Sequence, residues 1–233
     1  MRSAESIPRL FFDTLNEALG KDPMMRLIAT CQWVLVLGFV VLGSLDSEAA
    51  PPAASLGAER AVDPAAFISK IMTKSMKNLT DQKIDDAERE RRFRKIVHET
   101  FTARLAGKFV LGRYWPQATQ AERAEFVRLF QERMVMHNVK QFKRFKAEDV
   151  LFKIVTTQPI GKNDSLVRTK VGGKNSAKLV AMDWRVVRVN GRFRVFDVLV
   201  EGMSMGLAHR SEYRSFIKRN GGTVGSLLEA LRK

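Results

Sequence analysis

Apolar residues recur at helical spacing from residue 63 to about residue 146, and the period changes to two after residue 149. Asp63 is suited to cap a first helix, with Pro64 at its first position. The apolar stripe of this helix holds Phe67, Ile68, Ile71, Met72, Met76 and Leu79. The pattern therefore predicts an amphipathic helix that buries one face.

Two more helices are predicted before the period changes. One spans residues 85–101, with the charged run 88–92 facing solvent and Phe93, Ile96, Val97 and Phe101 facing inwards. The next begins at Thr119, which forms a capping box with Glu122, and continues to about Lys146. Its inward stripe contains Phe126, Leu129, Phe130, Met134, Val139, Phe142 and Phe145. This composition suits an ordinary core and a cavity wall equally well.

The period of two predicts four strands, over residues 150–158, 165–171, 177–189 and 193–201. Turns are expected at 161–164, at 172–175 and at Asn190-Gly191, a dipeptide that accepts the positive φ angles of a type I′ turn. Short turns imply antiparallel pairing, and the alternation gives the sheet one apolar face: Val180, Met182, Trp184 and Val186 on the third strand, and Phe196, Val198 and Val200 on the fourth. Helices over 207–218 and 224–231 complete an α+β fold.

Residues 1–49 are expected to lie outside this domain. A run from Leu27 to Leu45 is almost entirely apolar, with Arg26 before it and small residues after it. This order is typical of a signal peptide cleaved near Ala49 or Ala50, and the alternative is an uncleaved membrane anchor. Either reading places the remaining chain beyond the membrane. Residues 50–62 are expected to form a flexible leader, and residues 63–233 are expected to form one domain.

The start of the chain has a more natural position at Met24-Met25, directly before Arg26, than at Met1. The single cysteine, Cys31, lies within the apolar run. If this run is removed, disulfides, thiolate catalysis and cysteine metal sites are excluded.

The chain is strongly basic, with 40 Lys and Arg against 25 Asp and Glu. Residues 1–49 hold 4 basic and 6 acidic side chains, which leaves a net charge of +17 on the remainder. This surplus favours a polyanion or an anionic membrane surface. The run 140–146 interleaves aromatic and basic residues as a nucleic-acid surface does, but the export signal argues against nucleic acid. Phe142 and Phe145 are better explained as the core side of a helix.

Catalytic motifs are absent from the sequence. His98, His137 and His209 have no metal-ligand spacing, and there is no G-x-S-x-G, phosphate loop or dinucleotide fingerprint. Asp183 and Asp197 lie on neighbouring predicted strands and leave an acid/base pair open. Solvent or pairing with Arg185 and Arg194 explains these carboxylates more simply. We therefore expect neither an enzyme nor a metal or cofactor site.

Two blocks of the chain carry a recognisable signature in order. The first is Phe109-Val110-Leu111-Gly112-Arg113-Tyr114-Trp115, continued by Thr119, Phe126, Leu129 and Phe130. The second runs from Phe193 through Asp197-Val198-Leu199-Val200-Glu201-Gly202 to Met205, followed by Tyr213-Arg214-Ser215 and Phe216. They resemble the "LGRYW…T…F…F" and "W-K-V-Y-D-V…E-G-V-S…Y-R-S…F" signatures of the MlaC/toluene-tolerance family of periplasmic lipid-binding proteins. The Arg-rich helices also resemble its hopanoid-associated HpnM branch.

The resemblance implies a curved antiparallel sheet wrapped by N- and C-terminal helices around an apolar cavity. It implies that the protein shuttles phospholipid, or a hopanoid-like lipid, between an outer-membrane lipoprotein complex and an inner-membrane ABC transporter complex in the periplasm. The chain departs from the family at 203–210, where Met203-Ser204-Met205 stand, and methionines repack readily around ligands.

Candidate lipid-binding residues follow from the two blocks and the apolar stripes: Phe109, Val110, Leu111, Tyr114, Trp115, Phe126, Leu129, Phe130, Met134, Trp184, Val186, Phe196, Val198, Val200, Met203 and Met205. Each buried methylene contributes roughly 0.8 kcal/mol, so two acyl chains would supply ample driving force. Arg113 and Arg185 are the candidates for a phosphate headgroup at the mouth. Two alternatives stay open: a cell-envelope scaffold with a filled core, and an enzyme that uses Asp183 and Asp197 on an apolar substrate.

Overall fold

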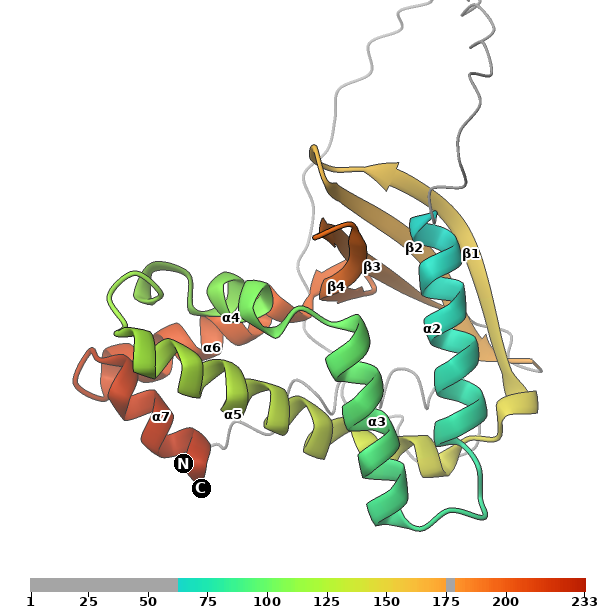
Figure 1. The fold of residues 1–233 in the computed structure, drawn as a ribbon, viewed down its shortest axis with the longest axis horizontal. Helices are drawn as coiled ribbons and strands as arrows, with labels where there is room; N and C mark the ends of the chain where they lie inside the picture. Colours follow the sequence, from blue (N-terminus) through green and yellow to red (C-terminus); the bar gives the residue numbers. More distant parts are fainter. Residues whose placement is uncertain (1–62, 175–178) are drawn as a thin grey trace, which may run out of the picture. The chain divides into compact units, whose positions relative to one another are not determined.

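A computed structural model describes residues 63–174 and 179–233 (Figure 1). The predictions for the signal peptide, Cys31, the start at Met24-Met25 and the leader 50–62 lie outside the described residues. The α-helices among them are α2 (Pro64–Leu79), α3 (Asp86–Thr100), α4 (Ala103–Leu111), α5 (Gln120–Val139), α6 (Met205–Arg219) and α7 (Val224–Arg232). Short 3-10 turns are η1 (Gly112–Tyr114), η2 (Lys140–Arg144) and η3 (Ala147–Asp149).

The predicted helix starts are confirmed by their caps. The Asp63 carboxylate accepts a hydrogen bond from the Ala65 amide at 3.2 Å. At the start of α5, the Thr119 amide donates to the Glu122 carboxylate at 2.8 Å, and the Glu122 amide donates to Thr119 Oγ1 at 3.2 Å. This reciprocal pair satisfies two amides that a helix end otherwise leaves without partners.

The strands β1 (Val150–Pro159), β2 (Asp164–Gly173), β3 (Val180–Val189), β4 (Arg192–Val200) and β5 (Met203–Ser204) form one antiparallel sheet in the order β1-β2-β3-β4-β5. The four long strands and the α+β class agree with the sequence-based prediction, and β5 is an addition. At the β3–β4 turn, Asn190 and Gly191 have φ values of 49° and 76°, as a type I′ turn requires.

A β-bulge changes which residues of β4 share a face. Arg185 pairs with Asp197 and Val186 pairs with Val195, so Phe196 is the extra residue. Phe193 and Val195 therefore lie on the same face as Val198, and the predicted grouping of Phe196 with Val198 and Val200 does not hold.

Three other expectations need correction. Arg89, placed in a solvated run, is 1% exposed and donates to the carbonyl oxygens of Leu79, Asp81 and Ile84, which fixes the turn between α2 and α3. Helix α5 ends at Val139 because the chain tightens into η2 and then turns towards β1 with Phe145 buried. The block at 109–115 covers the end of α4, a helix that the sequence pattern did not predict, and η1.

The apolar core is divided into separate clusters. Helix α2 lies along the sheet, where Ile68 and Met72 pack with Val167, Val186 and Val195 (Figure 1). A second cluster joins α4, α5, α6 and α7 around Phe126, Leu129, Ile217 and Leu228. Phe145, Val171 and Met182 form a third. Within 63–174 and 179–233, no helix has both the length and the hydrophobicity needed to cross a membrane.

Candidate functional site

A cavity of about 300 Å³ lies where the core clusters meet. Its walls come from α2 and α3, from the inner face of the sheet, and from α4, α5 and α6. The apolar lining residues include Ile71, Met72, Met76, Phe93, Ile96, Val97, Phe101, Ala106, Val110, Phe130, Met134, Phe142, Phe145, Val150, Val171, Met182, Trp184, Val195, Phe196, Val198 and Met205. The volume is at the lower end of the range for small-molecule pockets, and the walls are mostly apolar, as such pockets are.

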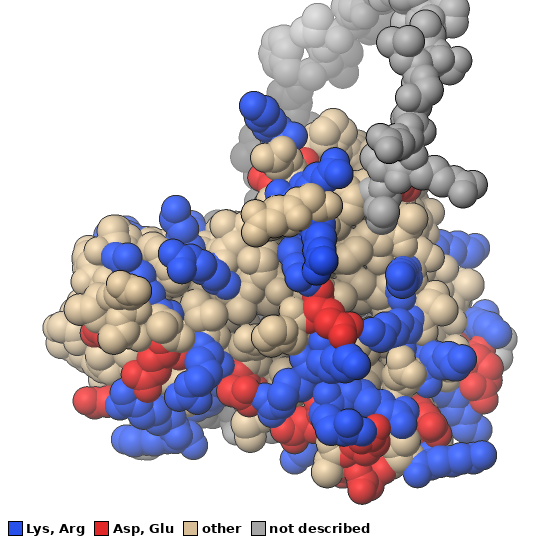
Figure 2. Space-filling model, in the orientation of Figure 1, with Lys and Arg blue, Asp and Glu red and all other residues tan. Residues whose placement is uncertain are grey.

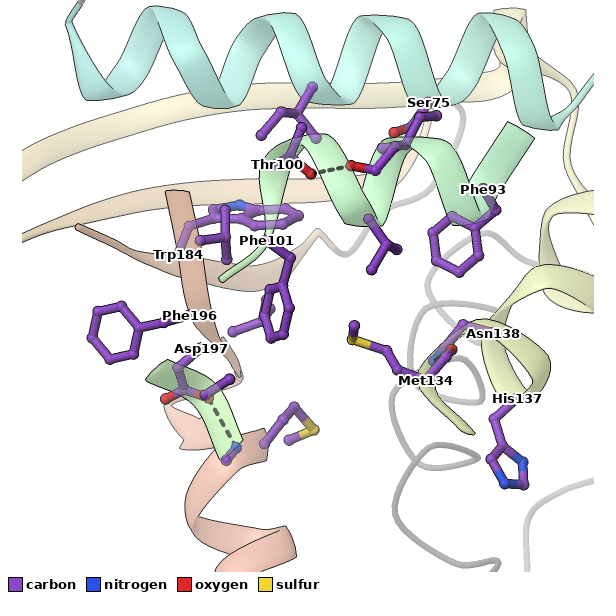
Figure 3. A pocket seen from close by; sticks show the side chains of 18 of the residues that line it. Ser75, Phe93, Thr100, Phe101, Met134, His137, Asn138, Trp184, Phe196 and Asp197 are labelled. Carbon is purple, nitrogen blue, oxygen red and sulfur yellow. Dashed lines mark hydrogen bonds between the residues drawn. The ribbon is translucent and has the colours of Figure 1, made fainter. Parts of the chain in front are cut away.

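Figure 3 shows the two sides of this cavity. Trp184, Phe196 and Asp197 stand on the sheet side, and Phe93, Met134 and Asn138 stand across from them. Trp184 Nε1 donates to Thr169 Oγ1 at 3.2 Å, and the Thr169 hydroxyl donates to the Met182 carbonyl oxygen. The polar atom of the indole is thus satisfied within the sheet, and its ring serves as apolar wall.

Asp197 holds the beginning of α6 against β4 at the edge of the cavity. Its carboxylate, 3% exposed, accepts hydrogen bonds from Ser204 Oγ at 2.6 Å and from the Gly206 amide at 2.9 Å (Figure 3). Arg185 Nη1 also donates a hydrogen bond to Asp197 Oδ2, at 3.2 Å. All of these partners belong to neighbouring backbone or side chains, so Asp197 acts as a structural link between sheet and helix.

The second carboxylate considered for catalysis, Asp183, does not line the cavity. Burial raises the pKa of Asp183, although the Thr169 backbone and Arg168, 4.0 Å away, act in the opposite direction. Asp183 is therefore paired with Arg168 and Asp197 with Arg185, and the two carboxylates do not pair with each other. Among the described residues, no group of three or more histidine, cysteine or acidic side chains is placed to hold a metal ion.

The polar lining residues lie mainly along α5 and α6. His137 is exposed and Arg133 and Asn138 are half-buried, whereas Val110 and Val171 on other walls are at most 2% exposed. The cavity therefore opens along α5. Arg133 is oriented by α7, since its Nη2 donates to the carbonyl oxygens of Ala230 and Leu231, both at 3.1 Å.

A small polar group on α6 faces the same space. The His209 ring stacks on Tyr213 with 5.7 Å between centroids and meets Phe130 edge-on at 5.8 Å. His209 Nδ1 lies 3.5 Å from Glu212 Oε2, without the geometry of a hydrogen bond. Burial, followed by the charge of Glu212, raises the pKa of the Tyr213 hydroxyl, which remains a neutral phenol. This combination offers polar contacts to a ligand but no nucleophile with an adjacent base.

Seven of the sixteen residues singled out by sequence line the cavity: Val110, Phe130, Met134, Trp184, Phe196, Val198 and Met205. The other nine do not. Leu111, Tyr114, Trp115, Phe126 and Leu129 belong to the helical cluster, Val186 and Val200 to sheet clusters. The Phe109 ring packs edge-on against Phe196 at 6.1 Å, and Met203 is 48% exposed.

The two arginines predicted to meet a headgroup also lie away from the lining. Arg113 is exposed on η1, and Arg185 is paired with Asp197. The basic side chains that do line the cavity are Arg133 and the histidines His137 and His209. Sequence reasoning also left out the walls from α2 and α3, although their apolar stripes had been recognised as inward-facing. The sequence could not show that these two stripes lie beside the cavity, because that position depends on how the core clusters are arranged in the fold.

The fold and this cavity define an α+β protein with the structure of a binding protein for an apolar ligand. Comparison with known proteins is consistent with that class: residues 68–233 match the family described as MlaC protein, and the chain belongs to this family. Its fold is similar to that of a phospholipid-binding protein from Ralstonia solanacearum solved in complex with a phospholipid. The two share 16% sequence identity with a TM-score of 0.65, over 73% of this chain and 96% of the other.

Proposed function

We propose that this protein binds a phospholipid or a similar amphiphile with its acyl chains in the cavity and carries it through the periplasm. In this role it is the soluble component between an outer-membrane complex and an inner-membrane ABC transporter complex, and it performs no catalysis. The observation that carries the proposal is the apolar cavity between otherwise well-packed clusters. Family membership and the similarity to a phospholipid-binding protein support it.

The walls of the cavity are suited to hydrocarbon. They combine buried valines of the sheet with phenylalanine and methionine side chains of the helices. Each methylene transferred from water to such surroundings contributes roughly 0.8 kcal/mol, and methionine side chains adapt to chains of different shape. An acyl chain therefore needs no polar contact to bind.

The headgroup belongs at the opening along α5. Arg133 and His137 would supply positive charge or hydrogen-bond donors there, and Asn138 an amide. An arginine that already donates to two carbonyl groups keeps its remaining N–H groups oriented, which favours contact with a phosphate. This placement replaces Arg113 and Arg185.

The direct test is native mass spectrometry of the protein purified under mild conditions. A mass increase that corresponds to one phospholipid, identified after extraction, is the expected result. If repeated preparations carry no lipid and added phospholipid does not bind, the proposal is wrong and the alternative of a cell-envelope scaffold gains support.

A matched pair of substitutions distinguishes a cavity wall from filled core. Val198 on β4 lines the cavity, whereas Val186 on β3 lies in the cluster under α2 and is 0% exposed. V198E is expected to keep the far-ultraviolet circular dichroism of the wild type and to lose lipid. V186E buries a charge in packed surroundings and should unfold the protein. Val198→Phe, which narrows the cavity without adding charge, should also lower lipid content.

A further inference from the structure

The meander brings two turns to the same end of the sheet. The β1–β2 turn spans residues 160–163, and the β3–β4 turn is Asn190-Gly191. The Arg188 amide donates to the Asn163 carbonyl oxygen at 2.9 Å, which ties the turns together. Each presents an apolar side chain to solvent: Ile160 is 48% exposed and Val189 is 39% exposed. We call residues 160–164 and 187–192 the sheet tip.

Basic side chains surround these two apolar residues. Lys162, Arg188 and Arg192 are exposed, and none of them forms an ion pair with any residue that the structure describes. Asp164 is the single acidic residue of the sheet tip. Glu99 on α3, which lines a hollow together with Gly191 and Arg192, is paired with Lys74 at 2.8 Å. Figure 2 shows basic and uncharged side chains interspersed at this end of the sheet.

We propose that the sheet tip docks the protein onto an anionic phospholipid bilayer. Exposed aliphatic side chains enter the interface between headgroups and acyl chains, and neighbouring lysine and arginine side chains contact the phosphates. A shallow hollow lined by Phe67, Glu99 and residues 191–194 lies beside the tip, but neither Ile160 nor Val189 lines it. The two exposed apolar side chains project singly beside basic residues, which suits insertion into a lipid interface better than the packed contact that a protein partner requires.

The position of the chain's entry into the described domain agrees with this orientation. Helix α2 starts at the same end, since the Phe67 ring lies 5.9 Å from the Phe193 ring, directly after the β3–β4 turn. The first described residue, Asp63, therefore lies at the same end of the domain as the sheet tip. Docking does not require a loaded cavity, so this inference is independent of the proposed lipid transport.

The test compares binding to vesicles of phosphatidylcholine alone with binding to vesicles that also contain phosphatidylglycerol. Protein is recovered from cells that express the full chain, so that every variant has the same N-terminus. The readout is the ratio of the partition coefficients for anionic and neutral vesicles. The wild type is expected to favour anionic vesicles, and added salt should weaken this preference because the charges are exposed.

Two variants with matched controls locate the contact. The triple variant K162Q/R188Q/R192Q should lower the ratio by about fivefold for each charge removed. The control R214Q/K218Q/R219Q, which removes three exposed charges from α6, should change the ratio much less. The pair I160S/V189S should weaken binding to anionic vesicles more than M203S/L207S, whose side chains are similarly exposed.

The inference would be overturned if the sheet-tip variants and their controls changed the ratio of partition coefficients equally. It would also be overturned if the wild type bound anionic and neutral vesicles equally well. Native mass spectrometry of the same preparations reports cavity loading separately. Protein that carries no lipid and takes up none when phospholipid is added, but still depends on the sheet tip for vesicle binding, would refute the proposed transport while leaving docking intact.

Discussion

Gly206 illustrates how one residue without a side chain fixes the edge of the cavity. A Cβ atom at this position would stand 2.6 Å from Phe109 Cε1 and 3.0 Å from Asp197 Oδ1. The Phe109 ring is held between the guanidinium of Arg210, 4.6 Å from its centroid, and the ring of Phe196. The ring therefore has little room to move aside, and α6 can approach β4 only with glycine here.

We expect Gly206→Ala to lower the free energy of unfolding by about 1–3 kcal/mol, because an extra methyl group in packed surroundings forces shifts of ring or backbone. Gly225→Ala is the control: it also lies in the first turn of a helix, but its Cβ would have no neighbour closer than 3.7 Å. Alanine should be neutral or stabilising there by up to about 1 kcal/mol. Urea denaturation measures both, and equal effects would contradict this account of Gly206.

Asp183 is expected to make stability depend on pH. Burial raises the pKa of its carboxyl in the folded state, so the folded protein retains a proton that the unfolded chain has already lost. The stability contributed by this residue therefore falls as the pH rises through the unfolded pKa of about 4 towards the folded value.

The substitution D183N should remove the loss of stability that Asp183 causes as the pH rises. The difference in free energy of unfolding between D183N and wild type should shift in favour of the variant as the pH rises above about 4. Denaturation with urea at several pH values provides the comparison. A difference that shifts towards the wild type with rising pH would indicate that Arg168 outweighs burial.

At the level of elements, capping is the interaction that sequence specified best. Asp63 and Thr119, the two caps predicted from the sequence, receive the amide hydrogen bonds expected of N-caps, and the structure adds Asp85 at the start of α3. Thr102, at the start of α4, makes no such side-chain bond. This contrast explains in part why α4 was not predicted although α5 was.

T119A should therefore destabilise the protein by about 1 kcal/mol, since α5 loses its capping box. T102A should cost less because no cap bond is lost. Thermal or urea unfolding of the two variants tests this difference. Equal losses would show that the cap geometry of Thr119 contributes nothing specific.

Elements that depend on long-range contacts were not accessible from the local pattern. The bulge at Phe196 shifts the face of β4 by one residue, and an unbroken period of two cannot reveal it. Arg89 looks like a surface residue among charged neighbours, but the turn after α2 supplies three carbonyl groups that enclose it. In both cases a segment outside the helix or strand itself decides where a side chain points, a neighbouring turn for Arg89 and the paired strand for β4.

For the whole molecule, the order of helices and strands followed from periodicity except for α4 and β5, and the apolar cavity followed from the family resemblance. The position of the cavity did not. Phe126 and Leu129 share the stripe of Phe130 and Met134 on α5. The cluster of α4 to α7 encloses the first two, and the Phe126 ring packs against Tyr213 on α6 at 5.9 Å, whereas Phe130 and Met134 also line the cavity. A stripe of uniform hydrophobicity does not indicate which of its residues pack against a neighbouring helix and which line a cavity.

The division of the core into separate clusters has a consequence if the cavity holds a lipid as proposed. An amphiphile in the cavity would contact both the cluster of α2 with the sheet and the cluster of α4 to α7, and would therefore strengthen the packing between them. Unloading would then leave a looser molecule, with faster amide hydrogen exchange in α3 and along the opening. In the proposed transport, a partner that binds this looser form preferentially would lower the affinity of the protein for its lipid and so promote release.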